Sequence, residues 1–182
     1  MYNFSNLKIK TQEVVDWLKK EFQLIRTSRA TPAILDGVRV EAYGSRMPIS
    51  QMSTITGEDP KTLRVSPWDM SQSKAIEKAI QDSGLGLSVT SDDRGVRVHF
   101  PELSDERRAT LIKLCKQKLE EARISVKAER EKIWEEIQKK EKDGVISEDD
   151  KFRLKNDMQK IIDETNKRLE EMAESKEKEI SN

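Results

Sequence analysis

The feature that most constrains the fold is a helical sequence pattern that stops near residue 30 and resumes only at Ser104. The sequence between these points has short alternating apolar and polar stretches bounded by glycine and proline, which is typical of β-structure. The periodicity after Ser104 then continues nearly to the end of the chain. We therefore expect a helical body, built from both ends of the chain, with a small β-containing domain inserted into it.

Three helices are predicted from apolar residues that recur every three or four positions. The first ends near Arg29, because Thr31-Pro32 follows and proline disfavours helix in the preceding residue. The second opens at Ser104, a plausible N-cap, and ends at Gly144, and the third starts after a second N-cap, Ser147. The expected core positions are Leu7, Val14, Leu18, Phe22 and Ile25 in the first helix, Leu111, Cys115, Leu119, Ala122, Val126, Ile133 and Ile137 in the second, and Leu154, Met158, Ile161, Thr165, Leu169 and Met172 in the third. Because the turn at Gly144 is short, the second and third helices should be antiparallel neighbours, with the first covering their groove as a three-helix bundle.

The segment 31–104 predicts a β/α/β domain. Alternation over Gly37–Gly44, Met47–Ser53 and 63–65 predicts strands, with turns at Asp59-Pro60 and Ser66-Pro67. A short helix is predicted over Ser71–Ser83, capped by Gly84, and a hairpin turn at 92–95 joins two last strands. The predicted class is therefore α+β, with residues 1–30 plus 105–182 as the bundle and 31–104 as the inserted domain.

Charge is unevenly distributed although the net charge is zero. Residues 107–132 carry nine basic and four acidic side chains, while 31–104 carry eight basic and ten acidic ones. A polyanionic partner would therefore be attracted by a locally basic surface, because the chain as a whole has no net positive charge. The single cysteine, Cys115, excludes an intrachain disulfide and favours a buried apolar role. No apolar run approaches a membrane span, and we expect a soluble cytoplasmic protein with no membrane partner.

The second predicted helix carries a basic stripe. At roughly 100° per residue, Lys116, Arg123, Lys127, Arg130 and Trp134 fall within an arc of about 60° beside the apolar seam. Cations at helical spacing can follow a phosphate backbone, and RNA is favoured over duplex DNA because no helix-turn-helix or zinc-finger pattern is present. A solvated charged face explains the same residues, so a helical adaptor that docks other helices remains an alternative.

Catalytic and metal-binding residues are not predicted. The only histidine, His99, lies on the exposed face of a predicted strand, and no serine or cysteine nucleophile can be argued. The glycines at 84 and 86 lack the Lys-Ser/Thr of a phosphate-binding loop. The acidic run at 148–150 lacks the spacing of a calcium loop and is better explained as the start of a helix. A nucleic-acid-modifying enzyme is therefore the least favoured function, and no cofactor is expected.

Several segments resemble the ribosome recycling factor family, in order and over nearly the whole chain. They are IRTSRATPAILDGVRVEAYG (25–44), PISQM from Pro48, Lys61-Thr-Leu with Pro67-Trp-Asp, IEKAI with SGLGL (76–87), LSDERR (103–108), EARISVKAER (121–130) and VISEDD (145–150). The resemblance implies an L-shaped two-domain molecule, with a long three-helix bundle and the inserted β/α/β domain. It also implies a monomeric, non-enzymatic translation factor that acts on the post-termination 70S ribosome. With elongation factor G, which hydrolyses the GTP, such a factor splits the subunits and frees mRNA and tRNA.

The resemblance also implies site residues. The family's bundle contacts large-subunit ribosomal RNA, and its basic positions fall on Arg26, Arg29, Arg123, Lys127, Arg130 and Lys132. Its hinges fall on Ala30, Thr31 and Pro32 and on Leu103, Ser104 and Asp105.

This sequence departs from the family pattern at three places. Ser28 replaces the usual glycine, Lys127 stands where arginine is common, and Glu131-Lys132 replaces Arg-Asp after Arg130. The lysine loses a bidentate phosphate contact.

Overall fold

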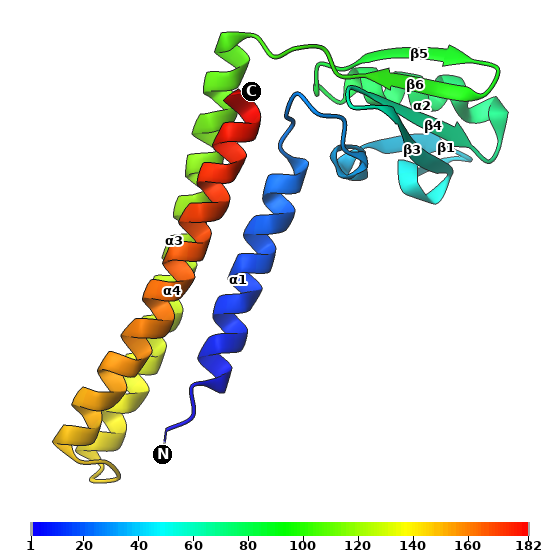
Figure 1. Cartoon of the computed structure of the whole chain (residues 1–182). Helices are drawn as coiled ribbons and strands as arrows, with labels where there is room; N and C mark the ends of the chain where they lie inside the picture. The colour runs from blue at the N-terminus through cyan, green and yellow to red at the C-terminus, as the bar shows by residue number, and fades with distance from the viewer. Residues whose placement is uncertain (1, 182) are drawn as a thin grey trace. The chain divides into compact units, whose positions relative to one another are not determined.

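The computed structural model describes residues 2–181 and has an α+β fold, which confirms the predicted class. Three long helices, α1 (Ser5–Leu24), α3 (Asp105–Lys142) and α4 (Glu148–Ser181), run side by side, and a small sheet domain is inserted between α1 and α3 (Figure 1). Contacts divide the chain into two units. The helical unit comprises the residues up to Phe22 with Lys113–Glu177, and the sheet unit comprises Gln23–Ile112 with the residues from Lys178 on.

The helical unit is the predicted three-helix bundle. Helix α1 contacts both partners, through Glu21 with Lys118 of α3 at 3.1 Å and Gln12 with Arg168 of α4 at 3.0 Å. Helices α3 and α4 are antiparallel around a turn in which Gly144 has a φ of +70°. The side chains that are completely buried between these helices include Leu18, Cys115, Ala122, Ile137, Met158 and Leu169.

Both predicted N-caps are confirmed. Ser104 Oγ accepts a hydrogen bond from the Arg107 amide at 3.3 Å, and Ser147 Oγ accepts one from the Asp150 amide at 3.1 Å. These bonds satisfy amides that have no partner within the first turn of a helix.

Three predicted core positions are shifted by one residue. Val15, Ile162 and Ala173 are buried, whereas Val14, Ile161 and Met172 are only partly buried. In each case two adjacent apolar residues both border the seam, and the side from which the neighbouring helix approaches selects one of them.

The predicted end of the first helix is wrong. Helix α1 ends at Leu24, not near Arg29, and the chain leaves the helix while burying Ile25, Arg26 and Thr27. Thr27 Oγ1 accepts a hydrogen bond from the Arg29 amide at 3.2 Å, which holds a turn that is incompatible with continued helix. The free energy gained by burying these side chains therefore favours an end of the helix several residues before Pro32.

The sheet unit contains four antiparallel strands in the order β3-β4-β6-β5 and a separate hairpin, β1-β2. The bounds are Arg39–Ala42 (β1), Ser45–Pro48 (β2), Ser53–Asp59 (β3), Thr62–Pro67 (β4), Ser88–Asp92 (β5) and Gly95–His99 (β6). Helix α2 (Ser73–Asp82) packs against β1 and one face of the sheet. The core between them includes Val40, Ile49, Leu63, Val65, Ile76, Val96, Val98 and Phe100.

Two strand predictions need correction. Residues Met47–Ser53 do not form one strand, because a short 3-10 turn (Ile49–Gln51) separates β2 from β3 and buries Ile49 completely. Ser66-Pro67 is not a turn but the end of β4, where Pro67 pairs with Ser53. The hairpin at 92–95 is confirmed by the pairing of Asp92 with Gly95.

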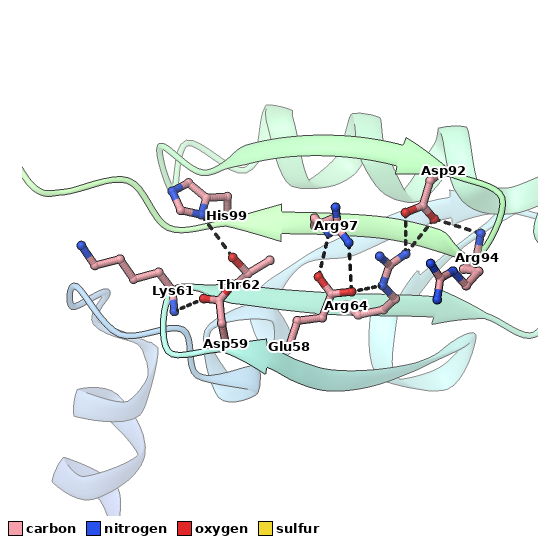
Figure 2. A network of polar contacts seen from close by, with 9 residues as sticks. All are labelled: Glu58, Asp59, Lys61, Thr62, Arg64, Asp92, Arg94, Arg97 and His99. Atoms are coloured by element: carbon pink, nitrogen blue, oxygen red, sulfur yellow. Dashed lines mark hydrogen bonds and ion pairs between the residues drawn. The ribbon is translucent and has the colours of Figure 1, made fainter.

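The face of the sheet that does not contact α2 carries a network of ion pairs (Figure 2). Arg64, on the central strand β4, donates from Nε to Glu58 at 2.7 Å and from Nη1 to Asp92 at 2.7 Å. Glu58 also accepts from Arg97 Nε at 2.7 Å. Hydrogen bonds from Arg97 and Arg64 hold the pKa of Glu58 below its usual range, and the bond from Arg64 does the same for Asp92. His99 is exposed, as predicted, and contacts the Thr62 hydroxyl.

Candidate nucleic-acid interface

Three of the five residues of the predicted basic stripe border a groove between α3 and α4 in the helical unit. The groove has a volume of about 380 Å³. Its lining residues are Arg123, Val126, Lys127 and Arg130 from α3 and Gln159, Ile162, Asn166 and Glu170 from α4. Val126 and Ile162 are buried at its base, so the polar side chains form its walls. The structure thus brings three of the predicted site residues together on one surface.

Arg130 occupies a position where a helix that only packs would place an apolar side chain. It is partly buried, and its Nε donates to Gln159 Oε1 of α4 at 3.2 Å. This bond fixes the plane of the guanidinium and uses one N–H, while the two terminal nitrogens form no hydrogen bond within the described residues. A guanidinium held in this way can give two parallel bonds to one phosphate with little further loss of side-chain entropy.

Lys127 and Arg123 lie on the same side of α3 but differ in their partners. Lys127 is exposed, and within residues 2–181 it forms no ion pair. Arg123 Nη2 is held by Glu170 Oε1 of α4 at 2.5 Å, and a second carboxylate, Glu120, lies 3.9 Å from Nη1. The Arg123 charge is therefore partly neutralised within the chain, and a phosphate would have to compete with Glu170 for it.

Lys132 does not lie in this groove. It borders a different groove, between α1 and α3, together with Trp17 and Ala128. Its Nζ is paired with Glu129 at 2.6 Å. Two residues along a helix correspond to a rotation of about 200°, which explains why Lys132 and Arg130 face different neighbours. The structure therefore does not bring Lys132 together with the other basic residues.

Arg26 and Arg29 belong to the sheet unit and have opposite environments. Arg29 is exposed, whereas Arg26 is only 6% exposed. The Arg26 guanidinium donates to the carbonyls of Leu85, Gly86 and Pro101 and lies 5.9 Å from the centre of the Phe100 ring. The expectation that Arg26 contacts RNA does not fit this burial, and we assign it a structural role.

Three polar residues of the groove were not predicted. Gln159, Asn166 and Glu170 are spaced by seven and four positions on α4 and border the buried seam. The sequence shows this spacing, but it does not indicate which polar residues of α4 face α3. Asn166 Oδ1 is buried and has no hydrogen-bond partner among the described residues, so the base of the groove retains an unused acceptor.

The predicted hinge residues lie in or beside the non-helical segments that flank the sheet domain. Thr31 is extended, Pro32 begins a short 3-10 turn, and the Ala30 amide donates to the Pro60 carbonyl at 2.9 Å. On the returning segment Leu103 is buried, Ser104 caps α3 and Asp105 is its first residue.

Neither a metal site nor a membrane span is found in the part of the chain that the structure describes. No three of its His, Cys, Asp and Glu side chains are grouped so that they could hold a metal ion. None of the helices within residues 2–181 combines the length and the apolar character needed to cross a bilayer.

Comparisons with known proteins agree over nearly the whole chain. Residues 18–180 match the family model described as ribosome recycling factor. The ribosome-recycling factor of Symbiobacterium thermophilum is 42% identical over 171 residues, which are 94% of this chain and 92% of the relative. That of Carboxydothermus hydrogenoformans is 43% identical over 169 residues, or 93% of this chain and 91% of the relative.

Solved structures give the same result. A solution structure of ribosome recycling factor superposes with a TM-score of 0.73 at 35% identity and covers 100% of this chain and 99% of that one. A second similar chain is the T. thermophilus ribosome recycling factor, described together with E. coli elongation factor G as bound to the E. coli post-termination complex. Its TM-score is 0.66 at 36% identity, with 97% of this chain and 96% of that chain covered.

The fold and these matches place the chain among the translation factors. It belongs to the ribosome recycling factor family, and the match to that family includes the C-terminal part of α1 from residue 18, all of α3, nearly all of α4 and the inserted sheet domain.

Proposed function

We propose that this chain acts on the post-termination 70S ribosome as a non-enzymatic, monomeric factor in the cytoplasm. With GTP-bound elongation factor G, which hydrolyses the GTP, it dissociates the ribosome into subunits and releases mRNA and tRNA. Family membership supports this function, as does the similar chain that is described with elongation factor G on the post-termination complex.

The observation that carries the RNA-binding part is the placement of Arg130. A half-buried arginine that is oriented by Gln159, and whose two terminal nitrogens form no hydrogen bond within residues 2–181, is suited to a phosphate contact. With Lys127 and Arg123 it forms a surface, which we call the α3 groove face, that we propose binds large-subunit ribosomal RNA. Exposed Arg29 is proposed as a separate contact, while Arg26 and Lys132 are left out for the reasons given above.

The proposed action is mechanical. Helix α3 has 38 residues and is therefore about 57 Å long, which makes the helical unit a stiff body. We propose that residues 30–32 and 103–105 act as hinges, because the backbone at 30–31 and 103–104 is non-helical and can absorb a change in φ and ψ without breaking the bundle. Elongation factor G would displace the sheet domain or the bundle, and the stiff helices would carry that displacement to the contacts between the subunits.

Sedimentation of purified post-termination ribosomes tests this function. We expect subunits to form only when this chain, elongation factor G and GTP are all present, and reactions that lack one component should retain 70S particles. Splitting without GTP, or no splitting in the complete reaction, would contradict the proposal.

A pair of matched variants tests the α3 groove face. Arg130→Ala should weaken binding to the large subunit and reduce the slope of log K against log salt by about one, because one phosphate contact is lost. Lys132→Ala removes the same charge two residues away, from the other groove, and should leave both values unchanged. Equal effects of the two variants would show that general charge and not this face drives binding.

A further inference from the structure

The inserted segment exposes three large apolar side chains. Between residues 31 and 104 the exposed large hydrophobic residues are Tyr43, Trp68 and Met70, which are 68%, 72% and 45% exposed. Trp68 and Met70 are the sequence neighbours of Asp69, and the Tyr43 hydroxyl donates a hydrogen bond to the Asp69 carboxylate. We call these three residues the aromatic patch. Single exposed apolar residues are common on proteins, but tryptophan and tyrosine are enriched at interaction surfaces.

The local backbone holds the patch in place. Tyr43 has a φ of +52°, in the left-handed region that a bulky side chain rarely adopts, at the turn between β1 and β2. Its hydroxyl donates to Asp69 Oδ2 at 2.6 Å, and the Ser71 amide donates to Asp69 Oδ1 at 2.9 Å. The Trp68 amide donates to the Met52 carbonyl at 3.0 Å. The exposed rings therefore stand on a fixed backbone, which reduces the entropy lost when a partner binds.

The charge at the patch selects the kind of partner. The bonds from Tyr43 and Ser71 hold the pKa of Asp69 below its usual range, so the carboxylate is ionised at neutral pH. Within the described residues Asp69 forms no ion pair, and residues 31–104 carry ten acidic against eight basic side chains. An anionic partner such as nucleic acid is disfavoured here. A cation, by contrast, can lie over an exposed aromatic face and pair with the adjacent carboxylate.

We propose that the aromatic patch and Asp69 form a docking surface for a basic protein segment, with an arginine or lysine of that segment over the Trp68 ring. This inference rests on the proposed function, because the segment would belong to a protein of the post-termination complex. It concerns a different surface from the α3 groove face, which is basic and suited to RNA.

Site-specific cross-linking tests the proposal. Trp68 is replaced by the photoreactive residue p-benzoylphenylalanine, and the full chain is irradiated with purified post-termination ribosomes, with and without elongation factor G. Thr90, which is exposed on β5 in the same domain, carries the photoreactive residue in the control chain. Sedimentation of each sample before irradiation shows whether the chain is bound, and mass spectrometry identifies the cross-linked peptide.

We expect position 68, but not position 90, to cross-link to a protein peptide that contains lysine or arginine. A cross-link to ribosomal RNA, to a second copy of this chain or to a peptide without basic residues would overturn the proposal. A bound chain without any cross-link from position 68 would also overturn it while leaving the proposed function intact. Failure of the chain to sediment with ribosomes would overturn the proposed function and this inference together.

Substitutions provide an independent readout. Trp68→Ala should slow subunit splitting roughly tenfold at limiting partner concentration, as expected for a central aromatic contact. Trp68→Phe should restore most of the rate because it keeps an aromatic face, and Asp69→Asn should fall between the two. Since Trp68 is exposed, circular dichroism should show unchanged folding, and Thr90→Ala should split at the normal rate. A normal rate for Trp68→Ala would overturn the proposal.

Discussion

Replacing Arg26 with methionine removes a buried cation from the sheet unit while keeping an unbranched apolar stem. In the folded chain Nη1 donates to the Leu85 and Gly86 carbonyls at 2.9 and 2.8 Å, and Nη2 donates to the Pro101 carbonyl at 2.5 Å. Burial, with the nearby Arg107 charge as the second cause, lowers the pKa of the guanidinium. The variant would leave three carbonyls without their donor.

The expected loss can be derived from these contacts. A hydrogen bond from a charged donor contributes about 1.5–3 kcal/mol, so three would give roughly 4–9 kcal/mol before any opposing term. The desolvation of the guanidinium offsets several kcal/mol of this sum. Leu85, Gly86 and Pro101 are partly or fully exposed, so water can reach their carbonyls in the variant. We therefore expect Arg26→Met to lower the free energy of unfolding of the sheet unit by about 2–4 kcal/mol.

Native-state hydrogen exchange measures this loss where it should occur. Val65 and Val98 lie on the central strands β4 and β6 and are completely buried, so their amides report the opening of the sheet. Their exchange should become about 30- to 700-fold faster in Arg26→Met, since each 1.4 kcal/mol is a factor of ten. Arg29→Met, at the exposed arginine three residues away, should change exchange less than about threefold.

The same variant separates the two roles considered for Arg26. Two results together would refute the structural role and support the RNA contact predicted from sequence. The exchange rates of Arg26→Met would lie within threefold of those of the unmodified chain, and the salt dependence of its ribosome binding would be weaker. Arg26→Lys should recover less than half of the lost stability, because an ammonium cannot reach three carbonyls with the fork geometry of a guanidinium.

Three further outcomes are expected. Because the folded-state pKa of Asp92 is depressed by Arg64, its contribution to stability is complete above about pH 5 and is lost as the pH falls through that depressed value. The free energy of unfolding of Asp92→Asn, measured with urea, should therefore decrease less on acidification than that of the unmodified chain. Gly95→Ala should cost more than about 2 kcal/mol, because a Cβ there would lie 2.4 Å from the Val65 carbonyl at a φ of +127°, whereas Gly57→Ala, with open space, should stay within about 1 kcal/mol by the same assay. Glu170→Gln should free Arg123 and steepen the salt dependence of large-subunit binding by up to about one, and an unchanged slope would exclude Arg123 from the contact.

The sequence predicted those elements whose signals are local. The seam of α3, with Cys115, Val126 and Ile137, follows from periodicity, because one stripe must face the other helices. The caps at Ser104 and Ser147 and the hairpin at 92–95 depend on side chains within four residues of the atoms that they serve. Predictions of this kind need no knowledge of the rest of the chain.

The sequence did not predict features that depend on distant residues. The end of α1 at Leu24 is one example, since Ile25, Arg26 and Thr27 leave the helix to be buried in the sheet unit. The choice of Ile162 over Ile161 is another, because the packing of the neighbouring helices decides it. Periodicity places such residues near a boundary but does not assign them to one side.

A comparison of two arginines, Arg26 and Arg130, shows why site residues are harder to predict than helices. Arg26 and Arg130 were both predicted to lie in an amphipathic helix, and both were expected to contact RNA. The acceptors of Arg26 lie 59, 60 and 75 residues away in sequence, so its burial becomes visible only after the sheet unit has folded. Arg130 meets one neutral amide, Gln159, 29 residues away, which orients the guanidinium without occupying its terminal nitrogens. The number of distant acceptors, and not the arginine or its local sequence, therefore decides which guanidinium stabilises the fold and which can bind a phosphate.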